Sequence, residues 1–378
     1  MKVVRVEAFP VDLRYKPGKE FLVSYGVIDA MQNAIIRVTT DDGLVGYGEL
    51  MPLPLNDRTA CIEELKRVAA AVIGQSPFSL REIYARIDET ISEERTSREL
   101  LLKGSLDFAL HDLMGKAAGV PVYQLLGGSY DDGVPMHFSI SIRSPQEMGE
   151  DAAARVAEGF RTIEVKLGRF QGELDLETEI ARIAAIREAA GPDVVIVADP
   201  NQGWTVDEAI AVLPRLEEFD IYVEQPVKGL DDLTLVHSAI KIPLIADESV
   251  ATSRVVAEII RRDAADLINL KILRTGGIYE ACKMLDMCEA SGIGYRHDNV
   301  IQTRLASTMM IHFSTTYNAS LPDCGGTQFT RTIEDIVNDD EGVYMDGGTA
   351  KLRNPDAPGM GATPKPELLG DPILIAGR

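Results

Sequence analysis

After about residue 134 the chain alternates short apolar strands with amphipathic helices, and this alternation restricts its fold more than any other feature. Helical stretches such as ELDLETEIARIAAIREAAG separate the strands. Eight βα units in succession predict a parallel barrel of the (β/α)8 type. An open doubly wound sheet is the alternative, but no G-x-G-x-x-G follows the first strand. The eight strand-like segments are VPMHFSIS, TIEVKLG, VVIVADPNQ, IYVEQP, IPLIADES, DLINLKI, GIGYRHD and ASLPDCG.

The part of the chain before the barrel has a different pattern. Residues 1–50 alternate like strands, with Asp-Asp-Gly marking a hairpin turn. Helical periodicity follows in TACIEELKRVAAAVIG, in SLREIYARIDETI and in a longer segment that ends at Gly119. We expect an α+β capping domain over residues 1–125, joined by the C-terminal tail 355–378, and a barrel domain over residues 126–354. The tail is rich in Pro and Gly, which predicts irregular chain.

Composition narrows the class of protein and of partner. The formal net charge of the 378 residues is −21, which disfavours nucleic acid and anionic membrane surfaces and favours a small-molecule partner. The four cysteines lack the spacing of a zinc or disulfide framework. No run is long and apolar enough for a signal peptide or a membrane span. We expect a soluble cytoplasmic protein that forms a homo-oligomer.

Charged residues recur at the ends of the predicted barrel strands, which is where barrel enzymes place their catalytic groups. The third, fourth and fifth strands end in Asp199, Glu224 and Asp247, and the sixth ends in Lys271. The successive steps are 25, 23 and 24 residues, one βα unit each. The second strand ends in Lys166. Equal steps put these groups at one height around the barrel.

Strand alternation sharpens this placement, because residues two apart share a face. In TIEVKLG the apolar residues would face the helices, which leaves Glu164 and Lys166 pointing into the barrel. In LINLKI the same rule leaves Asn269 and Lys271 inside. The three strand-end carboxylates and the two lysines would then converge on one cavity.

Three carboxylates held this close would raise one another's pKa unless a cation joins them. Oxygen ligands with open positions suit Mg²⁺, one per subunit, with Mn²⁺ as the alternative. The two lysines are then available for proton transfer, and a divalent cation and a second ammonium nearby both favour their neutral form. A lysine on each side of a metal-bound carboxylate could remove and return the proton on the adjacent carbon.

Each of these residues also has a plain explanation. Asp199 in DPNQGW, Glu224 before Gln-Pro and Asp247 in ADES fit turn, strand-end or N-cap roles, and a lysine at a strand end is usually solvated. Capping alone predicts neither the even spacing nor the shared facing, so the combination favours an active site.

Residues after the last two strands are candidates for substrate contact. His297 and Asp298 are adjacent, so they point to opposite faces of a strand and form no dyad with each other. A pocket wall and a plain loop explain them equally well. Asp323 precedes Cys-Gly-Gly and fits a substrate contact or a turn.

With these residues in hand, the chain resembles the enolase superfamily, and within it the muconate-lactonizing, two-lysine subgroup of the mandelate racemase/muconate lactonizing enzyme family. The resemblance covers nearly the whole chain. LDFALHDLMGKAAGVPVYQLLGG is similar to the family's helix leading into the barrel. NLKILRTGG is similar to its Asn-x-Lys followed by Gly-Gly, and PGMG at 358–361 to its C-terminal signature. The strand-end carboxylates complete the likeness.

The resemblance implies a modified TIM barrel, (β/α)7β, with an N-terminal α+β capping domain whose loops near 21–25 and 51–56 would close over the pocket. It also implies Mg²⁺ ligands at the three strand-end carboxylates and acid/base lysines on opposite faces of the substrate. The expected site comprises the catalytic residues Lys166 and Lys271; the metal ligands Asp199, Glu224 and Asp247; the supporting residues Asn201, Glu248, Asn269 and Glu164; and the substrate contacts Tyr25, His297, Asp298 and Asp323.

The chain departs from the family pattern at three places. Glu164 stands where the subgroup often has the first lysine of Lys-x-Lys, and an inward carboxylate there would raise the pKa of Lys166. Gln302 stands where a glutamate is expected on the seventh strand. The last strand has DCGGT instead of the Asp-x-Asp with which dipeptide epimerases bind the substrate ammonium, which argues against dipeptide epimerisation.

The leading hypothesis is an isomerase that uses Mg²⁺ to remove the proton α to a carboxylate through an enediolate, the scheme known for enolase-superfamily enzymes. Racemisation or epimerisation of an amino-acid-like substrate, of proline or betaine type, is the first choice. A lyase, namely a dehydratase of a hydroxyproline-like or sugar acid, is the runner-up, and a cycloisomerase is third. A Schiff-base aldolase and a non-catalytic binding protein are the alternatives of a different class.

Overall fold

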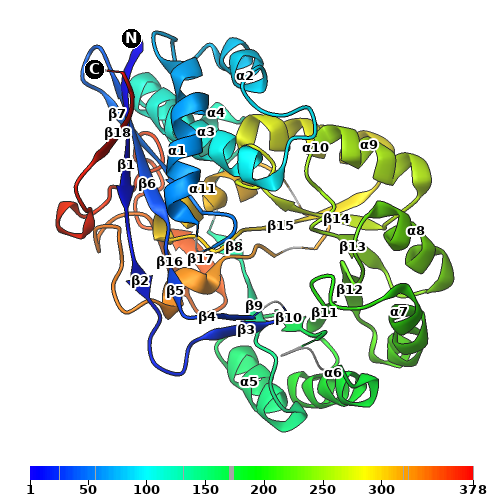
Figure 1. Ribbon diagram of the computed structural model, residues 1–378. Helices are drawn as coiled ribbons and strands as arrows, with labels where there is room; N and C mark the ends of the chain where they lie inside the picture. The colour runs from blue at the N-terminus through cyan, green and yellow to red at the C-terminus, as the bar shows by residue number, and fades with distance from the viewer. Residues whose placement is uncertain are drawn as a thin grey trace.

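Two units stand side by side in the computed structural model, which describes residues 1–377 apart from 25, 56, 131, 170–173, 318 and 322. An N-terminal unit of antiparallel strands and helices packs against a ring of parallel strands that is wrapped by helices (Figure 1). This α/β architecture has the two parts that the sequence pattern predicts.

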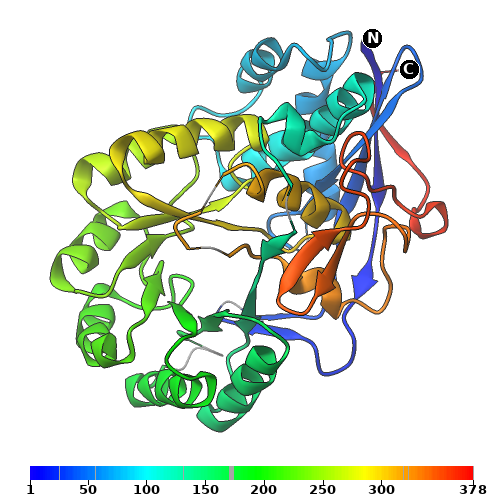
Figure 2. The same cartoon turned by 180° about the vertical axis from the view of Figure 1, so that it is seen from behind.

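The N-terminal unit is built on an antiparallel sheet. Asp-Asp-Gly forms the predicted hairpin turn in it, with the Gly43 amide 3.0 Å from the Thr40 carbonyl. The strand order is β18 (Ile373–Gly377), β1 (Val3–Pro10), β6 (Ala34–Thr40) and β7 (Val45–Leu50). Because β18 pairs with β1, the end of the chain lies beside its beginning (Figures 1 and 2). The tail is therefore not wholly irregular: its last apolar residues complete the edge of this sheet.

Two short strand pairs extend from this sheet towards the barrel. They are β2 (Leu13–Arg14) with β5 (Ala30–Met31), and β3 (Phe21–Val23) with β4 (Gly26–Ile28). The second pair forms a hairpin, called the capping hairpin below, that reaches the first barrel strands (Figure 1).

The central helix of the unit is α3 (Ser97–Ala118). It begins with a capping box of Thr96 and Glu99 and ends, as predicted, at Gly119, whose φ of 73° few other residues adopt. A Cβ at Gly48 of β7 would lie 2.0 Å from the Ser105 carbonyl oxygen of α3, so only glycine lets the strand and helix pack this closely. The other helices of this unit are α1 (Arg58–Ala69), the 3-10 turn η1 (Ala70–Val72), α2 (Leu80–Asp88) and α4 (Val122–Leu125).

The barrel contains a sheet of seven parallel strands in chain order. Cys324 of the eighth segment forms parallel bridges with Met136 and His297, which places this segment between the first strand and the last. The expected (β/α)7β barrel is thereby confirmed. The strands are β9 (His137–Ile140), β10 (Thr162–Lys166), β11 (Val195–Asp199), β12 (Tyr222–Glu224), β13 (Leu244–Ala246), β14 (Leu267–Lys271) and β15 (Gly294–Asp298).

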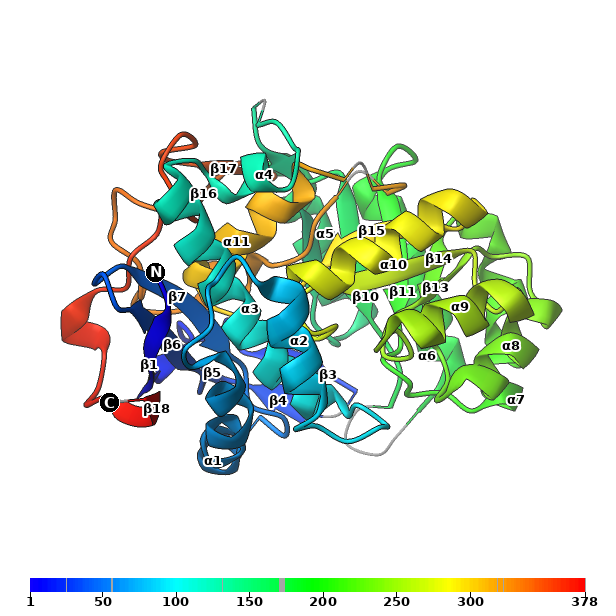
Figure 3. The same cartoon turned by 90° about the horizontal axis from the view of Figure 1, so that it is seen from above.

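Helices cover the outer face of the strands (Figure 1). The helix that follows β14, α10, also contacts the N-terminal unit, because α3 lies between the antiparallel sheet and α10 (Figure 3). The barrel helices are α5 (Pro145–Ala157), α6 (Leu176–Ala190), α7 (Val206–Val212), α8 (Leu230–Ala239), α9 (Ser253–Arg262), α10 (Ile278–Ser291) and α11 (Arg304–Ser314).

Two elements differ from the expectation. The segment VPMHFSIS is divided: β8 (Val134–Pro135) joins a separate sheet with β16 (Val343–Asp346) and β17 (Thr349–Leu352), and only its second half enters the barrel. The helical stretch between β11 and β12 is α-helix only over Val206–Val212 and continues as the 3-10 helix η2 (Leu213–Phe219), because Pro214 lacks the amide that an α-helix needs. The remaining 3-10 turns are η3 (Thr327–Arg331) and η4 (Pro366–Leu368). Within the described part of the chain, no helix has the length and apolar content to cross a bilayer.

Candidate active site

A cavity of about 500 Å³ lies at the carboxyl ends of the barrel strands, and both predicted lysines line it. Lys166 ends β10 and Lys271 ends β14. Three strands, β11 to β13, separate these two in the sheet, so the lysines face the cavity from opposite sides of the barrel mouth. The carboxylate-bearing strand ends lie between them.

The N-terminal unit covers this cavity. Phe21 of the capping hairpin and Met51, Leu53 and Leu55 of the following loop line it. Both loops that the family resemblance pointed to therefore contribute side chains. Tyr25, the expected substrate contact in the hairpin, lies outside the described residues.

Three fully or almost fully buried carboxylates lie close together beside the cavity, and of these Glu164 lines it. Asp199, Glu224 and Glu164 each place an oxygen within 4.8 Å of the other two. Burial and the neighbouring carboxylates raise the pKa of Glu224 well above its usual range, and burial raises that of Asp199. Burial also acts on Glu164, but Lys166 and His137 outweigh it and hold that pKa low. Buried oxygen donors that repel one another are a set that a divalent cation fits.

Asp247, the third expected metal ligand, is held by two cations. Its carboxylate accepts hydrogen bonds from Lys271 Nζ at 2.7 Å and from Arg274 Nη2 at 2.5 Å. Burial would raise its pKa, but Arg274 and Lys271 bring it down to about 2. Glu164, rather than Asp247, therefore completes the closest carboxylate group with Asp199 and Glu224 among the residues that the structure describes.

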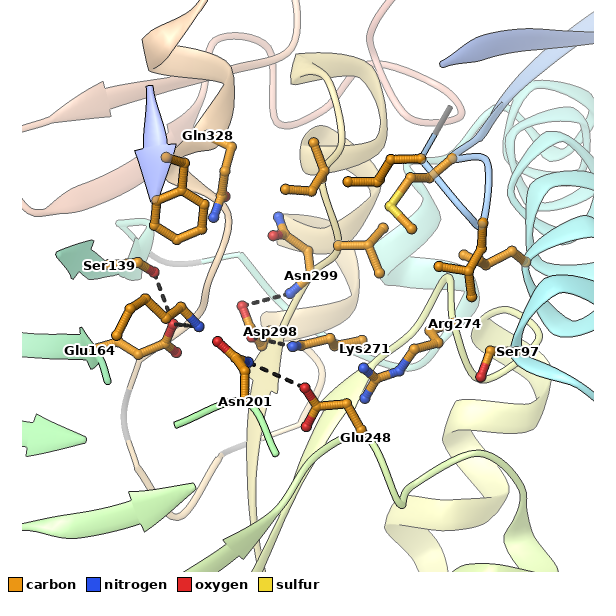
Figure 4. A pocket seen from close by; sticks show the side chains of 18 of the residues that line it. Ser97, Ser139, Glu164, Asn201, Glu248, Lys271, Arg274, Asp298, Asn299 and Gln328 are labelled. Carbon is orange, nitrogen blue, oxygen red and sulfur yellow. Dashed lines mark hydrogen bonds and ion pairs between the residues drawn. The ribbon is translucent and has the colours of Figure 1, made fainter. Parts of the chain in front are cut away.

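Each lysine lies between two carboxylates. Lys166 Nζ donates to Asp199 and lies 2.6 Å from Glu164 Oε1. Lys271 Nζ donates to Asp247 and lies 3.2 Å from Asp298 Oδ2 (Figure 4). Burial lowers the pKa of a lysine, but these carboxylates outweigh burial and raise the pKa of both. The raised pKa of Lys166 agrees with the effect expected of an inward Glu164, whereas the expected lowering of the lysine pKa values depends on a bound divalent cation.

The expected supporting asparagines orient the carboxylates. The Asn201 amide N lies 2.8 Å from Asp199 Oδ1, and its side-chain Nδ2 lies 2.9 Å from Oδ2. The same Nδ2 reaches Glu248 Oε1 at 3.2 Å (Figure 4). Asn269 Nδ2 donates to Glu224 Oε1 at 2.7 Å. Asn201 thus orients both oxygens of Asp199, and Asn269 orients one oxygen of Glu224.

The expected substrate contacts divide between the two faces of β15. Asp298 lines the cavity. His297 does not, because strand alternation turns it outward, where its ring packs 5.4 Å from that of Phe313 and burial lowers its pKa to about 4. Asp323 lies inside the barrel, 3.4 Å from Arg296 Nη2, and does not line the cavity either.

Sequence reasoning missed a buried charge network behind the carboxylates. Arg296 is fully buried, with Nη1 2.9 Å from Glu224 Oε2 and 3.6 Å from Glu164 Oε2. His137 Nε2 lies 3.3 Å from the same Glu164 oxygen. The sequence GYRHD could have predicted the position of Arg296, because strand alternation places Arg296 on the same face of β15 as Asp298.

The rest of the cavity wall comes from several elements: β9 with Ser139, η3 with Gln328, α3 with Leu101, and the loops after β14 and β15. The Ser139 hydroxyl donates to Glu164 at 3.0 Å (Figure 4). Both side-chain polar atoms of Asn299 and the Gln328 carbonyl oxygen are buried without a hydrogen-bond partner. The remaining wall residues include Arg274 and the apolar Leu101, Val300 and Ile301.

Known protein families match both units of this chain. The description "Mandelate racemase / muconate lactonizing enzyme, N-terminal domain" matches residues 6–127, and "Enolase C-terminal domain-like" matches residues 147–368. The protein belongs to the mandelate racemase/muconate lactonizing enzyme family. The predicted superfamily is therefore confirmed, and with it the expectation of an enzyme of the isomerase type.

Relatives in this family catalyse more than one reaction. The chain is 31% identical over 349 residues to an N-succinyl-L-Arg/Lys racemase of Bacillus cereus, covering 90% of this chain and 91% of the relative. It is 29% identical over 385 residues to a cis-3-hydroxy-L-proline dehydratase of Roseibium aggregatum, covering 99% of each.

The fold likeness extends over a complete solved structure. A dipeptide epimerase from Cytophaga hutchinsonii, complexed with Mg and the dipeptide D-Ala-L-Val, superposes with a TM-score of 0.89, 28% identity and full coverage of both chains. These relatives are racemases, epimerases and a dehydratase that act on small molecules. They do not place this family member in the muconate-lactonizing subgroup.

Proposed function

We propose that this family member is a Mg²⁺-dependent racemase or epimerase of the two-lysine type, which removes and returns the proton α to the carboxylate of an amino-acid-like substrate. The observation that carries the proposal is the pair of buried lysines that face one cavity from opposite sides. Inversion of a carbon centre requires a proton donor opposite the acceptor, and Lys166 and Lys271 stand in that relation.

The carboxylates between the lysines would hold the metal ion. We infer that Asp199, Glu224 and Asp247 are its ligands, and that Asn201 and Asn269 keep the first two oriented through their hydrogen bonds. When bound, the ion would offset the negative charge that holds both lysines protonated and stabilise the charge that develops on the substrate carboxylate.

The lysines would exchange roles with the direction of reaction. For one enantiomer Lys166 takes the α-proton and the Lys271 ammonium delivers one to the other face; for the opposite enantiomer the roles reverse. Glu164 and Asp298 each lie beside one lysine, at 2.6 Å and 3.2 Å, and would stabilise the ammonium form that each lysine must reach.

The cavity walls support an amino-acid-like substrate. Asp298 projects into the cavity and could receive a substrate nitrogen that carries a proton or a positive charge. It fills space next to the last strand: a Cβ at Gly325 would lie 1.6 Å from Asp298 Oδ1, so an aspartate at position 325 would require Asp298 to move. This supports a substrate class other than dipeptides, with the proline or betaine type as our proposal.

Two alternative reactions could be assigned to the same cavity. The hydroxyproline dehydratase relative favours β-elimination as the second candidate, in which one lysine removes the α-proton and the other serves the leaving hydroxyl. A Schiff-base aldolase is disfavoured, because a nucleophilic lysine needs a lowered pKa and both cavity lysines have a raised one.

Proton NMR in D₂O tests the proposal. Wild-type protein with Mg²⁺ should exchange the α-proton of a substrate from a panel of amino acids, N-acyl amino acids, proline derivatives, betaines and sugar acids. Lys166→Ala should lose exchange with one enantiomer and Lys271→Ala with the other, each by about 10²–10⁴-fold. Lys241→Ala, at an exposed lysine, is the matched control.

The product spectrum separates the reactions. Epimerisation retains every substituent, whereas dehydration removes a hydroxyl group and yields a new unsaturated or keto product. Exchange that persists in EDTA, or that is equal in wild type and both lysine variants, would contradict the proposed function.

A further inference from the structure

Arg331 carries a buried positive charge that forms no ion pair with a carboxylate of the described residues. It ends η3 and is 7% exposed. Arg296 and Arg304, which are similarly buried, each form an ion pair with a carboxylate. Within the described ranges, no Asp or Glu forms an ion pair with Arg331, although buried charges are normally paired.

Neutral groups hold the Arg331 guanidinium instead. Nη1 donates to the Lys19 carbonyl at 3.3 Å and Nη2 to the Ser139 carbonyl at 2.9 Å. The guanidinium carbon lies 4.8 Å from the ring centre of Phe21 and 5.2 Å from that of Phe138. Nε is buried and has no hydrogen-bond partner. Carbonyls and rings stabilise a cation only in part, so the Arg331 guanidinium can still gain from binding an anion.

More positive charge gathers around this residue. Burial is the main cause that lowers the pKa of Arg331; Tyr15 and Asp151 act against it, and repulsion from Arg155 and Arg143 adds smaller lowering effects. In a chain of net charge −21 such a group of cations is unexpected. It is therefore a local feature of this surface and not a consequence of composition.

A second cavity, of about 250 Å³, lies beside Arg331. Lys19 and Arg155 line it together with Arg331, and Thr327 and Thr330 add polar atoms. Among the described residues that line it, Glu158 is the one acidic residue, and its carboxylate already lies 2.6 Å from Arg155 Nη1. Arg331 and Lys19 are thus the cations that remain for a ligand.

We propose that this second cavity binds a small oxyanion, a phosphate or a carboxylate group, between Arg331 and Lys19. The guanidinium offers planar donors that match such anions, and the Lys19 ammonium adds charge at the open side. Because Arg331 also stacks on Phe21 of the capping hairpin, which lines the candidate active site, an anion here would act on that hairpin. The proposal does not depend on the reaction proposed above.

Thermal unfolding with inorganic phosphate tests this site. Phosphate is titrated at constant ionic strength against chloride, and Kd follows from the rise in Tm, because a ligand that binds only the folded state stabilises it. Lys19→Glu, at an exposed position, and Arg331→Gln should each weaken binding by at least about fivefold, as expected for loss of a charge-assisted contact. Lys241→Glu is the matched control and should bind like wild type.

Two further arms identify where the anion binds and which kind it is. Lys271→Ala should leave phosphate binding unchanged, whereas a loss would place the anion in the candidate active site and overturn the proposal. Acetate in place of phosphate shows whether a carboxylate is preferred. Equal stabilisation of wild type, Lys19→Glu and Arg331→Gln, or none with either anion, would also overturn it.

Discussion

Replacing Glu164 with glutamine should lower the pKa of Lys166. Glu164 Oε1 lies 2.6 Å from Lys166 Nζ, and two unit charges at this distance interact by roughly 6 kcal/mol at an effective dielectric constant of about 20. That figure is an upper limit, because Asp199 remains beside the lysine and neighbouring charges typically shift a pKa by about 1–3 units. We expect a decrease of about 1–3 units, equivalent to about 1.4–4 kcal/mol.

The sign of the kinetic effect follows from the role of the base. A lysine base must be neutral, so the rate rises with pH up to the lysine pKa, and a lower pKa moves this rise to lower pH. The assay is kcat/KM for α-proton exchange against pH, measured with each enantiomer separately. Only the enantiomer that uses Lys166 as base should respond, because Glu164 makes no ion pair with Lys271 among the described contacts.

Glu248→Gln is the matched control for this experiment. It makes the same isosteric change in the same cavity, and the Glu248 carboxylate is bonded to Asn201 rather than to Lys166. If Glu164→Gln leaves the pH rise unchanged for both enantiomers, the tuning of Lys166 by Glu164 is refuted. If both enantiomers shift equally, the assignment of one lysine to each face is refuted.

Three further outcomes test the stability and metal binding of the site. Lys103→Met removes a fully buried ammonium that lies 2.9 Å from Glu280, and should lower the free energy of unfolding, measured in urea, by about 3 kcal/mol. Lys66→Met, at an exposed ion pair, is the control and should change this free energy by less than about 1 kcal/mol. Equal losses in the two variants would contradict the prediction. Burial and Asp247 raise the pKa of Glu248 to about 7, so metal-free protein should lose stability as pH rises from about 4.5 to 7. Glu248→Gln should remove part of this loss, which urea midpoints at pH 5 and 8 in EDTA will show. Mg²⁺ titration calorimetry should find binding at least about tenfold weaker in Glu224→Gln than in wild type, and equal affinity would exclude Glu224 as a ligand.

The sequence predicted the strand-end charges well because barrel geometry is periodic. Parallel strands in chain order bring equivalent positions together, and the register makes Lys166 the partner of Asp199 and Lys271 the partner of Asp298. The contact between each lysine and its carboxylate therefore follows from spacing alone. Of the expected substrate contacts, His297 and Asp323 do not line the cavity, and for His297 this agrees with its position on the opposite face of the strand from Asp298.

The remaining site residues could not be predicted because loops carry no period. Arg274 follows β14 in a turn, and its pairing with Asp247 depends on where that turn folds. Asn299 follows β15 in a loop and Gln328 lies in the short 3-10 helix η3, and the two meet only through tertiary packing. The charge state of the lysines depends on these same neighbours: Glu164 raises the pKa of Lys166 as its inward position predicts, whereas the pairing of Lys271 with Asp247 and Asp298 gives a second raised pKa.

Two sequence motifs that lie far apart in the chain meet behind Lys271. The Gly-Gly after β14 starts α10, and the Ile278 amide there donates to Asp107 Oδ1 of α3 at 2.7 Å. A Cβ at Gly277 would lie 2.2 Å from Asp107 Cγ, so glycine is required for α3 to approach the helix start. The helix of the N-terminal unit is thereby fixed to the segment that carries Lys271 and Arg274. The position of Lys271 relative to the loops that cover it is therefore fixed, because α3 also packs against β7 and the sheet from which those loops extend.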